Sequence, residues 1–360
     1  MPTFEVHPDI AQARTLDTSF YTGAQHLAAA VDKLFAPSWQ YVGHTDMLVD
    51  NGSAVPTMLL EKFVDEPLVL VKDQEGRVRC LSNVCTHRGN LLVNEACSVD
   101  KLRCRYHGRH FELDGRFRSM PEFKEVRDFP GAADNLREYP LHQWGKLLFT
   151  SVSAKPEAPH PFAEMEARMS WLPMDKLEFR PDLSADHAVR ANWALYTENY
   201  LEGFHIPFVH PSLNAVLDFG DYTTELFPRS SLQLGIAKKD EACFELPPGS
   251  PDHGKRVAAY YWWVFPNLMF NFYPWGLSLN VVRPDGVDRC MVSFLTFVLD
   301  ATKLGSGAGA GLDQVEKEDE EVVEAVQKGI RSRAYTHGRY SVTREQGTHH
   351  FHRLIAELMG

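Results

Sequence analysis

The sequence has few cysteines, no excess of positive charge and no long run of apolar residues. Its 360 residues include 37 Lys and Arg against 48 Asp and Glu, which gives a net charge of −11 that is spread along the chain. Nucleic-acid binding depends on clustered Lys and Arg, so this balance argues against a phosphate backbone as the main partner. No segment reaches the roughly 20 apolar residues of a membrane-spanning helix. We expect a globular enzyme that binds neither nucleic acid nor a membrane.

The cysteines and the first residues favour a cytoplasmic location. The start, MPTFEVHPDIAQ, lacks the basic and apolar blocks of a signal peptide. In a reducing compartment, metal binding or simple burial of cysteine is commoner than disulfide bonding. The six cysteines stand at positions 80, 85, 97, 104, 243 and 290. Cys80 and Cys97 show no partner pattern, so we expect both to be small buried residues.

Changes of composition divide the chain into four segments. Residues 1–40 carry helical spacing, residues 41–150 consist of short apolar runs between turn dipeptides, and residues 151–165 begin as a linker rich in proline and small residues. Residues 166–360 mix helices with aromatic strands that follow one another. This pattern predicts an α+β protein with an all-β domain at 41–150, an α+β domain at 166–360, and the N-terminal segment packed on the latter.

Individual elements of the second domain are also predicted. Helices are expected at about 192–206, 312–330 and 344–358. Strands are expected at 258–265, 267–273, 277–284 and 289–299. The strands hold many aromatic residues, and because their faces alternate, about half of these rings can line a pocket. The rings are Tyr260, Tyr261, Trp262, Trp263, Phe265, Phe270, Phe272, Tyr273 and Trp275.

Four residues in the β-rich segment have the spacing of a metal site. Cys85-Thr-His87 is followed, after 16 residues, by Cys104-Arg-Tyr-His107. Zinc sites of the Cys₂His₂ type usually place both thiolates before both imidazoles, so zinc is a rival but a poor match to this alternating order. The order suits a Rieske [2Fe–2S] centre, in which two cysteines hold one iron and two histidines the other. His110 lies outside the repeated spacing and is expected at the surface or beside the site.

A second group of possible ligands lies in the segment 192–211. On one helix, Glu198, Glu202 and His205 would lie within roughly 60° of each other on the side that faces the core. A buried Glu–His network without metal is the plain alternative. Pro207 is expected to end this helix just after His205, so that His210 approaches the same point from another direction.

A third ligand is expected from the helix at 312–330. Asp319 lies in the middle of an apolar face formed with Val315, Val322, Val326 and Ile330. A buried carboxylate needs a positive partner, and a metal ion held by the two histidines would supply one. This is the 2-His-1-carboxylate set that binds Fe(II) and leaves positions open. The remaining acids are expected to face solvent: Asp313, Glu316, Glu318, Glu320, Glu321 and Glu324.

Together the two groups resemble the motifs of Rieske non-haem iron oxygenase α subunits. The surroundings CTHRGN and CRYHGRHFELDG are similar to the Rieske domains of ring-hydroxylating oxygenases. The catalytic domain of that family is matched by E-N-Y-x-E-x-x-H-x₄-H and by QVEKEDEEVVEAVQKG, in family order, over about residues 85–330. Many members of this family have Asp at the position of Glu202, with one more residue of spacing before the first His. This chain has Glu and the shorter spacing, a pattern similar to that of choline monooxygenase-like and quaternary-ammonium demethylase-like members.

The resemblance implies a helix-grip-like catalytic domain and a role for each site residue. It implies a [2Fe–2S] cluster on Cys85, His87, Cys104 and His107, and a mononuclear Fe(II) on His205, His210 and Asp319. Glu202 would link the cluster of a neighbouring subunit to this iron, within a head-to-tail homotrimer. Glu198 and Asn199 match positions that orient the ligands.

The resemblance also implies an activity. A terminal oxygenase of this family uses O₂ and electrons from NAD(P)H, delivered by a reductase with or without a ferredoxin, to hydroxylate or N-demethylate a small substrate. A quaternary amine held by cation–π contacts with the aromatic strands would fit. Three alternatives stay open: an aromatic-ring hydroxylating dioxygenase, a Rieske electron-transfer protein without oxygenase activity, and a zinc-stabilised binding protein. A basic patch of Arg88, Arg103, Arg105 and Arg109 would suit an acidic electron donor.

Overall fold

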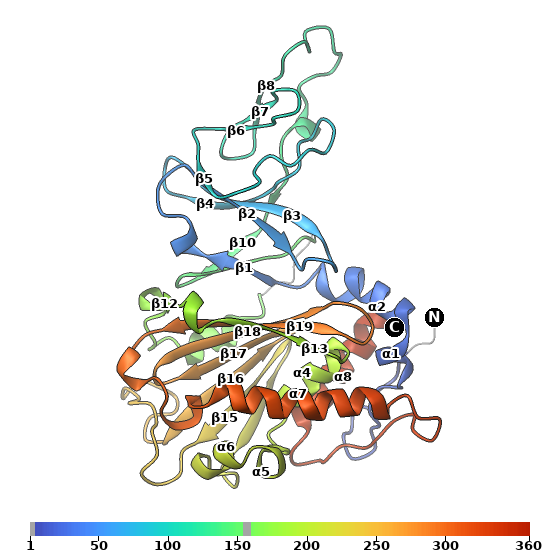
Figure 1. The fold of residues 1–360 in the computed structure, drawn as a ribbon, viewed down its shortest axis with the longest axis vertical. Helices are drawn as coiled ribbons and strands as arrows, with labels where there is room; N and C mark the ends of the chain where they lie inside the picture. The colour runs from blue at the N-terminus through green and yellow to red at the C-terminus, as the bar shows by residue number, and fades with distance from the viewer. Residues whose placement is uncertain (1–3, 154–159) are drawn as a thin grey trace. The chain divides into compact units, whose positions relative to one another are not determined.

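A computed structural model describes residues 4–153 and 160–360, which form two compact units (Figure 1). The smaller unit is Ala36–Pro156, and the larger unit joins Met1–Phe35 to Glu157–Gly360. Part of the segment predicted as a linker, residues 154–159, lies outside the described residues. The described helices include none that is both long and apolar enough to cross a bilayer.

Short antiparallel strands build the smaller unit. They are β1 (Gln40–His44), β2 (Ser53–Leu59), β3 (Glu66–Lys72), β4 (Val78–Ser82), β5 (Cys97–Ser98), β6 (Leu102–Arg103), β7 (His110–Phe111), β8 (Phe117–Ser119), β9 (Glu138–Tyr139), β10 (Leu141–Trp144) and β11 (Leu147–Thr150). Three sheets result, with strand orders β5-β2-β3-β4-β9, β1-β11-β10 and β6-β7-β8. Alternate residues of β3, Val69 and Val71, turn inward and pack with Leu81, Leu102 and Phe111 into one core.

One large antiparallel sheet forms the centre of the larger unit. Its strands are β12 (Glu178–Phe179), β13 (Ala185–Val189), β14 (Thr223–Phe227), β15 (Ser230–Ile236), β16 (Val257–Val264), β17 (Leu268–Tyr273), β18 (Gly276–Pro284) and β19 (Cys290–Val298). Their order is β12-β19-β18-β17-β16-β15-β14, with β13 also paired to β19. The four long strands predicted from the aromatic pattern are therefore present. With its antiparallel sheet and flanking helices, the chain has the predicted α+β class.

Helices of the larger unit come from both ends and the middle of the chain. They are α1 (Ser19–Thr22), α2 (Ala24–Ala30), α3 (Ala163–Arg168), α4 (Trp193–Tyr200), α5 (Ile206–Val209), α6 (Pro211–Val216), α7 (Leu312–Gly329) and α8 (Gln346–Met359), with a π-helical turn η1 (Val31–Phe35) after α2. Figure 1 shows α7 lying across the large sheet next to α4. The helices predicted at 312–330 and 344–358 are confirmed.

The single helix predicted over 192–206 is wrong. Helix α4 ends at Tyr200, and the chain turns before α5 begins at Ile206. Gly203 lies in this turn because a Cβ there would come within 2.5 Å of the ring of Tyr222. Pro207 does not end a helix but lies in the first turn of α5. A backbone N–H at that position would have no partner within the helix, so proline costs no hydrogen bond there. Glu202 and His205 therefore lie on a loop.

A buried ion pair connects α3 to the loop before β16. The carboxylate of Asp252 is fully buried and receives Arg168 Nε at 2.7 Å and Lys255 Nζ at 2.9 Å. Burial raises the pKa of Asp252, but the bonds from Arg168 and Lys255 outweigh it and hold the pKa below its ordinary value. The charged form of this carboxylate therefore stabilises the folded state.

We expect Asp252→Asn to lower the free energy of unfolding by about 3 kcal/mol at neutral pH, because it leaves Arg168 half-buried without its main partner. Since the folded-state pKa is depressed, the wild-type advantage is complete above about pH 4 and disappears as the pH falls through the folded-state pKa. Urea unfolding at several pH values measures this. Asp182→Asn, at an exposed pair with Arg180, is the control and should leave the midpoint unchanged. An equal loss in both variants would contradict the assignment.

Candidate metal centres and cavity

Two loops of the smaller unit carry the Cys-x-His and Cys-x₂-His motifs, and they share one hydrogen-bond pattern. The N–H of Cys85 donates to the carbonyl five residues later at 2.8 Å, and the N–H four residues later donates back to Cys85 at 3.0 Å. Cys104 makes the same two bonds at 2.8 and 3.0 Å. Gly89 and Gly108 close the loops with φ of +71° and +73°, a conformation that favours glycine. The two motifs are thus presented by matching loops.

The loops bring the four predicted side chains together as a thiol pair and an imidazole pair. Cys85 and Cys104 are each 2% exposed within the core of the unit. The rings of His87 and His107 are 4.8 Å apart. The Nδ1 of His107 is buried and has no hydrogen-bond partner among the described residues. A buried ring nitrogen without a partner fits a metal ligand, so the donor set and its environment suit a Rieske cluster.

Hydrogen bonds favour negative charge on the sulfur of Cys104, whereas burial outweighs them at Cys85. Burial raises the pKa of Cys85. Burial also acts on Cys104, but the backbone N–H groups of Tyr106 and His107 outweigh it and lower the pKa of that thiol. The side-chain amide of Asn90 also donates to Cys104 Sγ, at 3.7 Å. These donors suit a thiolate ligand.

Two predictions around this site need correction. Arg109 is not part of a surface patch: it is 2% exposed and pairs with Asp134 at 2.6 Å. Its guanidinium also packs over aromatic rings, including Phe117 at 4.8 Å, which explains how a charged side chain is buried here. Arg88, Arg103 and Arg105 are exposed. Cys97 was expected to be buried but is exposed, because it lies on the short strand β5 at the end of its sheet.

His110 lies outside the cluster motif in space as well as in sequence. It is half-buried on β7, and its Nδ1 lies 3.1 Å from Ser119 Oγ. Cys80 is buried on β4, and burial raises the pKa of its thiol to about 12. The contact with Ser119 gives His110 a structural role, and burial gives Cys80 one, so neither residue is needed as a cluster ligand.

The second group of predicted ligands converges in the larger unit. The Nε2 of His210 lies 3.0 Å from Asp319 Oδ1, and the Nε2 of His205 lies 3.5 Å from the same oxygen. The two imidazole rings are 5.0 Å apart. Three different elements supply these atoms: the loop after α4, the junction of α5 and α6, and α7. Two imidazoles and one carboxylate that converge in this way fit a 2-His-1-carboxylate iron site.

Each histidine is oriented by a second carboxylate. Glu202 Oε1 accepts from His205 Nδ1 at 2.7 Å, and Glu318 Oε2 accepts from His210 Nδ1 at 2.8 Å. Glu202 also accepts the backbone N–H of Phe204 and of His205, which holds the loop. An Nδ1–H held in this way leaves Nε2 free as the ligand atom.

The electrostatics of His210 agree with this arrangement. Burial lowers the pKa of His210, but the carboxylates of Asp319 and Glu318 outweigh it and raise the pKa above its ordinary value. The site therefore attracts positive charge at the ring nitrogen that faces Asp319. A metal ion would satisfy the same attraction.

The apolar face predicted for α7 is wrong in part. Val322 and Val326 are 36% and 41% exposed, whereas Glu316, Val323 and Gln327 are buried. The helix is rotated from the predicted orientation because polar residues on its inner face are paired. Glu316, for example, accepts from the hydroxyl of Tyr196 at 2.8 Å.

Several acids of α7 that were expected to face solvent instead have partners. Glu318 contacts His210, Glu320 lies 2.9 Å from His187 Nδ1, and Glu324 pairs with Arg190 at 2.7 Å. Asp313 and Glu321 are exposed, as predicted. Apolar periodicity could not reveal these contacts, because their partners come from β13, the residue that follows β13, and the junction of α5 and α6.

Glu198 and Asn199 point to different places. Glu198 faces α8, where its Oε1 lies 2.9 Å from Nε2 of the fully buried His352. Asn199 lines the cavity beside the converging ligands. The structure therefore brings Asn199, but not Glu198, to the same cavity as Glu202 and Asp319.

A cavity opens onto these ligands, between α4, α7 and the large sheet. Six aromatic rings line it, namely Tyr196, Tyr200, Tyr222, Tyr261, Tyr273 and Phe294. Only Tyr261 and Tyr273 belong to the aromatic set named from the sequence. The other rings come from α4, the loop before β14, and β19.

Glu316 also lines the cavity. Burial raises the pKa of Glu316 to about 8, in spite of the hydrogen bond from Tyr196. At neutral pH this favours the uncharged form of the Glu316 carboxyl group. Periodicity placed Glu316 in solvent, and no sequence signal other than its position three residues before Asp319 marks it.

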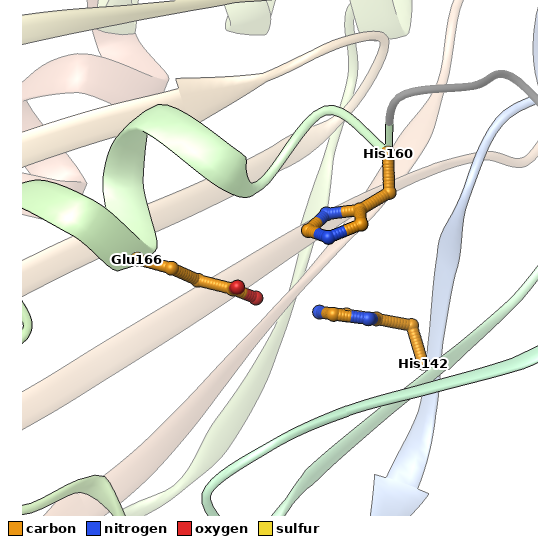
Figure 2. Close-up of side chains that lie close together, drawn as sticks. All are labelled: His142, His160 and Glu166. Atoms are coloured by element: carbon orange, nitrogen blue, oxygen red, sulfur yellow. The ribbon is translucent and has the colours of Figure 1, made fainter.

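Another histidine and carboxylate of the larger unit lie near each other at the start of α3. Figure 2 shows the imidazole of His160 and the carboxylate of Glu166, whose potential ligand atoms lie within 4.8 Å. Both side chains are half-buried. The figure also labels His142, on β10, which belongs to the smaller unit. Two donors within one unit do not make a metal site, and we assign none there.

Two family models match the chain. The model described as the ring hydroxylating alpha subunit (catalytic domain) matches residues 170–360. The model described as the Rieske [2Fe-2S] domain matches residues 38–130. The first contains the converging histidines and Asp319, and the second contains both cysteine loops.

Relatives match over nearly the whole chain. A chloroplastic choline monooxygenase of Arabidopsis thaliana is 28% identical over 98% of this chain and 84% of its own. The carnitine monooxygenase oxygenase subunit of Escherichia coli (strain K12) is 27% identical over 96% and 94%. Among solved structures, a quaternary ammonium Rieske monooxygenase in complex with L-carnitine has a TM-score of 0.75 at 20% identity, over 98% of this chain and 97% of that one. A naphthalene 1,2-dioxygenase from Rhodococcus sp. has a TM-score of 0.73 at 16% identity, over 96% and 94%. The structural matches establish a shared fold.

Proposed function

The chain belongs to the family of ring-hydroxylating oxygenase α subunits with a Rieske domain, and we propose that its substrate is a quaternary ammonium compound. As a member, it is an oxidoreductase that works with a [2Fe–2S] cluster, a mononuclear iron and a reductase partner. The observation that carries the substrate proposal is the cavity, which combines aromatic rings and carboxylates next to the converging ligands.

We assign the metals to the residues that the structure brings together. Cys85, His87, Cys104 and His107 would hold the cluster. His205, His210 and Asp319 would hold the mononuclear iron. When bound, these groups supply one-electron storage and the activation of O₂.

The protein residues around the iron ligands have a positioning role. Glu202 and Glu318 would fix the ring orientation and tautomer of His205 and His210. We propose in addition that Glu202 lies on the electron path from the cluster of a neighbouring subunit, within a homotrimer. Glu198 would act only indirectly, through the packing of α4 on His352.

The aromatic cavity suits a cation without acidic protons. Tyr222, Tyr261 and Tyr273 form a continuous wall, with ring centroids 6.4 and 6.0 Å apart along the series. Each ring face that meets a quaternary ammonium contributes about 0.5–2 kcal/mol. Glu316 adds a carboxyl group at the same cavity. An uncharged aromatic hydrocarbon would offer neither charge nor hydrogen bonds to the polar groups that line the cavity.

The overall reaction balances as a monooxygenation. One oxygen atom of O₂ enters a C–H bond of the substrate and the other leaves as water, with two electrons from NAD(P)H and two protons consumed. If the bond attacked belongs to an N-methyl group, the hydroxymethyl product releases formaldehyde and leaves a tertiary amine. We propose a cytoplasmic location, where unpaired thiols such as those of this chain are usual.

The function can be tested with the purified holoprotein, a surrogate reductase and NADH. We expect about three iron atoms per chain, two in the cluster and one at the mononuclear site. We also expect O₂ uptake and product formation with quaternary ammonium compounds, and little or none with naphthalene. Formaldehyde release then separates N-demethylation from hydroxylation elsewhere.

Three results would contradict these assignments. About two iron atoms per chain, with no turnover on any compound, would indicate an electron carrier. Turnover of naphthalene with no response to quaternary ammonium compounds would indicate an aromatic-ring hydroxylase. A colourless zinc protein would contradict the cluster assignment itself.

A further inference from the structure

A row of buried polar side chains crosses the sheet under the cavity. The strand register pairs Gln233 with Tyr261, Tyr261 with Asn271, and Asn271 with Ser278, across β15, β16, β17 and β18. Asn280 lies on the same face, two residues after Ser278. All five line the cavity and none is more than 8% exposed. Buried sheet faces are usually apolar, so this polar row indicates a ligand that hydrogen-bonds.

The protein itself uses only part of the hydrogen-bonding capacity of the polar row. Asn271 Nδ2 donates to the backbone oxygen of Ser278 at 3.1 Å, and the hydroxyl of Ser278 donates to Asn280 Oδ1 at 2.9 Å. The described residues provide no partner for Asn271 Oδ1 or for the NH₂ group of Asn280. The row therefore offers both an acceptor and a donor to a bound molecule.

The fixed charges of the side chains that line the cavity are negative. Glu202 and Asp319 line it as carboxylates and Glu316 lines it as an uncharged carboxyl group at neutral pH, whereas no Lys or Arg is found among its lining residues, all of which the structure describes. The positive charge of a divalent ion bound to His205, His210 and Asp319 would be offset by Asp319 itself and by the carboxylates of Glu202 and Glu318, which contact the two histidines. A carboxylate bound at the polar row would thus be buried without a cationic partner, which is unfavourable.

We propose that the polar row binds a neutral hydrogen-bonding group of the substrate, such as a hydroxyl, and that the cavity rejects zwitterions that carry a carboxylate. This inference rests on the proposed quaternary ammonium function and narrows it to cationic alcohols. The ammonium group occupies the aromatic wall, and the hydroxyl meets the amides of Asn271 and Asn280. A hydroxyl both donates and accepts, as these two amides require.

Binding to the holoenzyme distinguishes the possibilities with four ligands. Choline is a quaternary ammonium alcohol, glycine betaine and carnitine are zwitterions, and 3,3-dimethylbutanol is the uncharged isostere of choline. Titration calorimetry should give a dissociation constant for choline at least tenfold below those of both zwitterions and of the isostere. NADH-coupled turnover should follow the same order.

A substitution in the polar row tests the cause of this selectivity. Asn280→Lys introduces the missing cation, so we expect glycine betaine to bind at least tenfold more tightly and choline to bind more weakly than in the wild type. Asn280→Met is the matched control, because methionine is similar to lysine in length but carries no charge. This variant should bind choline more weakly than the wild type and should not bind glycine betaine more tightly.

Each outcome has a separate meaning. If wild-type enzyme binds glycine betaine or carnitine within twofold of choline, the inference about the polar row is wrong, while the quaternary ammonium function stands. If the uncharged isostere binds as well as choline, the proposed function fails and the inference with it. Should Asn280→Lys not fold, the ligand series on the wild type still decides the question.

Discussion

Glu202→Gln should reduce turnover by 10-fold to 100-fold or more while iron content stays at the wild-type value. The substitution keeps the shape of the side chain but removes the charge that accepts from His205 Nδ1 and from two backbone N–H groups. The ligand atoms of His205, His210 and Asp319 are untouched, so the mononuclear metal is retained. Steady-state kinetics with iron analysis measure both parts of this expectation.

Glu318→Gln is a matched comparison, because Glu318 holds the other histidine in the same way. If Glu202 only orients a ligand, the two variants should be alike. If it also lies on the electron path, reoxidation of the reduced cluster by O₂ in the presence of substrate should slow in Glu202→Gln alone. Equal reoxidation rates in both variants would exclude the path through Glu202.

Cys104→Ser should abolish turnover and the visible absorption of the cluster. The sulfur lies in a buried pocket with N–H donors from the loop and from Asn90, and a serine oxygen binds iron weakly in place of a thiolate. Iron should fall from about three atoms per chain to about one, because the mononuclear site lies in the other unit. Absorption spectra, EPR after reduction and iron analysis measure this loss.

Cys97→Ser provides the control for this change. Cys97 is exposed, and its nearest polar contact is the backbone oxygen of Ala54 at 3.9 Å. The Cys97→Ser variant should keep the visible absorption, iron content and activity of the wild type. Loss of the cluster in both variants would mean that the four assigned ligands are wrong or incomplete.

The fold and the ligand sets could be predicted from local patterns, whereas the surroundings of the ligands could not. Strands such as β16 and β17 are apolar runs bounded by turn residues, so their positions were evident in the sequence. The roles of Glu316 and Glu318 depend on the rotation of α7, which is set by partners such as Tyr196 far away in the chain. Periodicity counts apolar residues and gives no weight to a buried acid that is paired.

The loop after α4 is a second example of this limit. The sequence placed Glu202 and His205 on a helix because their spacing fits one face. In the structure α4 ends at Tyr200 and a turn follows, in which Gly203 lies so close to the ring of Tyr222 that no side chain would fit. The polar row could be recognised only after the strand register was known, since its five residues come from four strands.

The acidic face of α7 also bears on how freely this protein can be altered. Its charged residues would ordinarily be the first choice for changes that improve solubility or expression, because surface positions on helices tolerate substitution. Here Glu318, Glu320 and Glu324 each hold a side chain from another element: His210, His187 or Arg190. Redesign of this helix is therefore best confined to exposed positions such as Asp313 and Glu321.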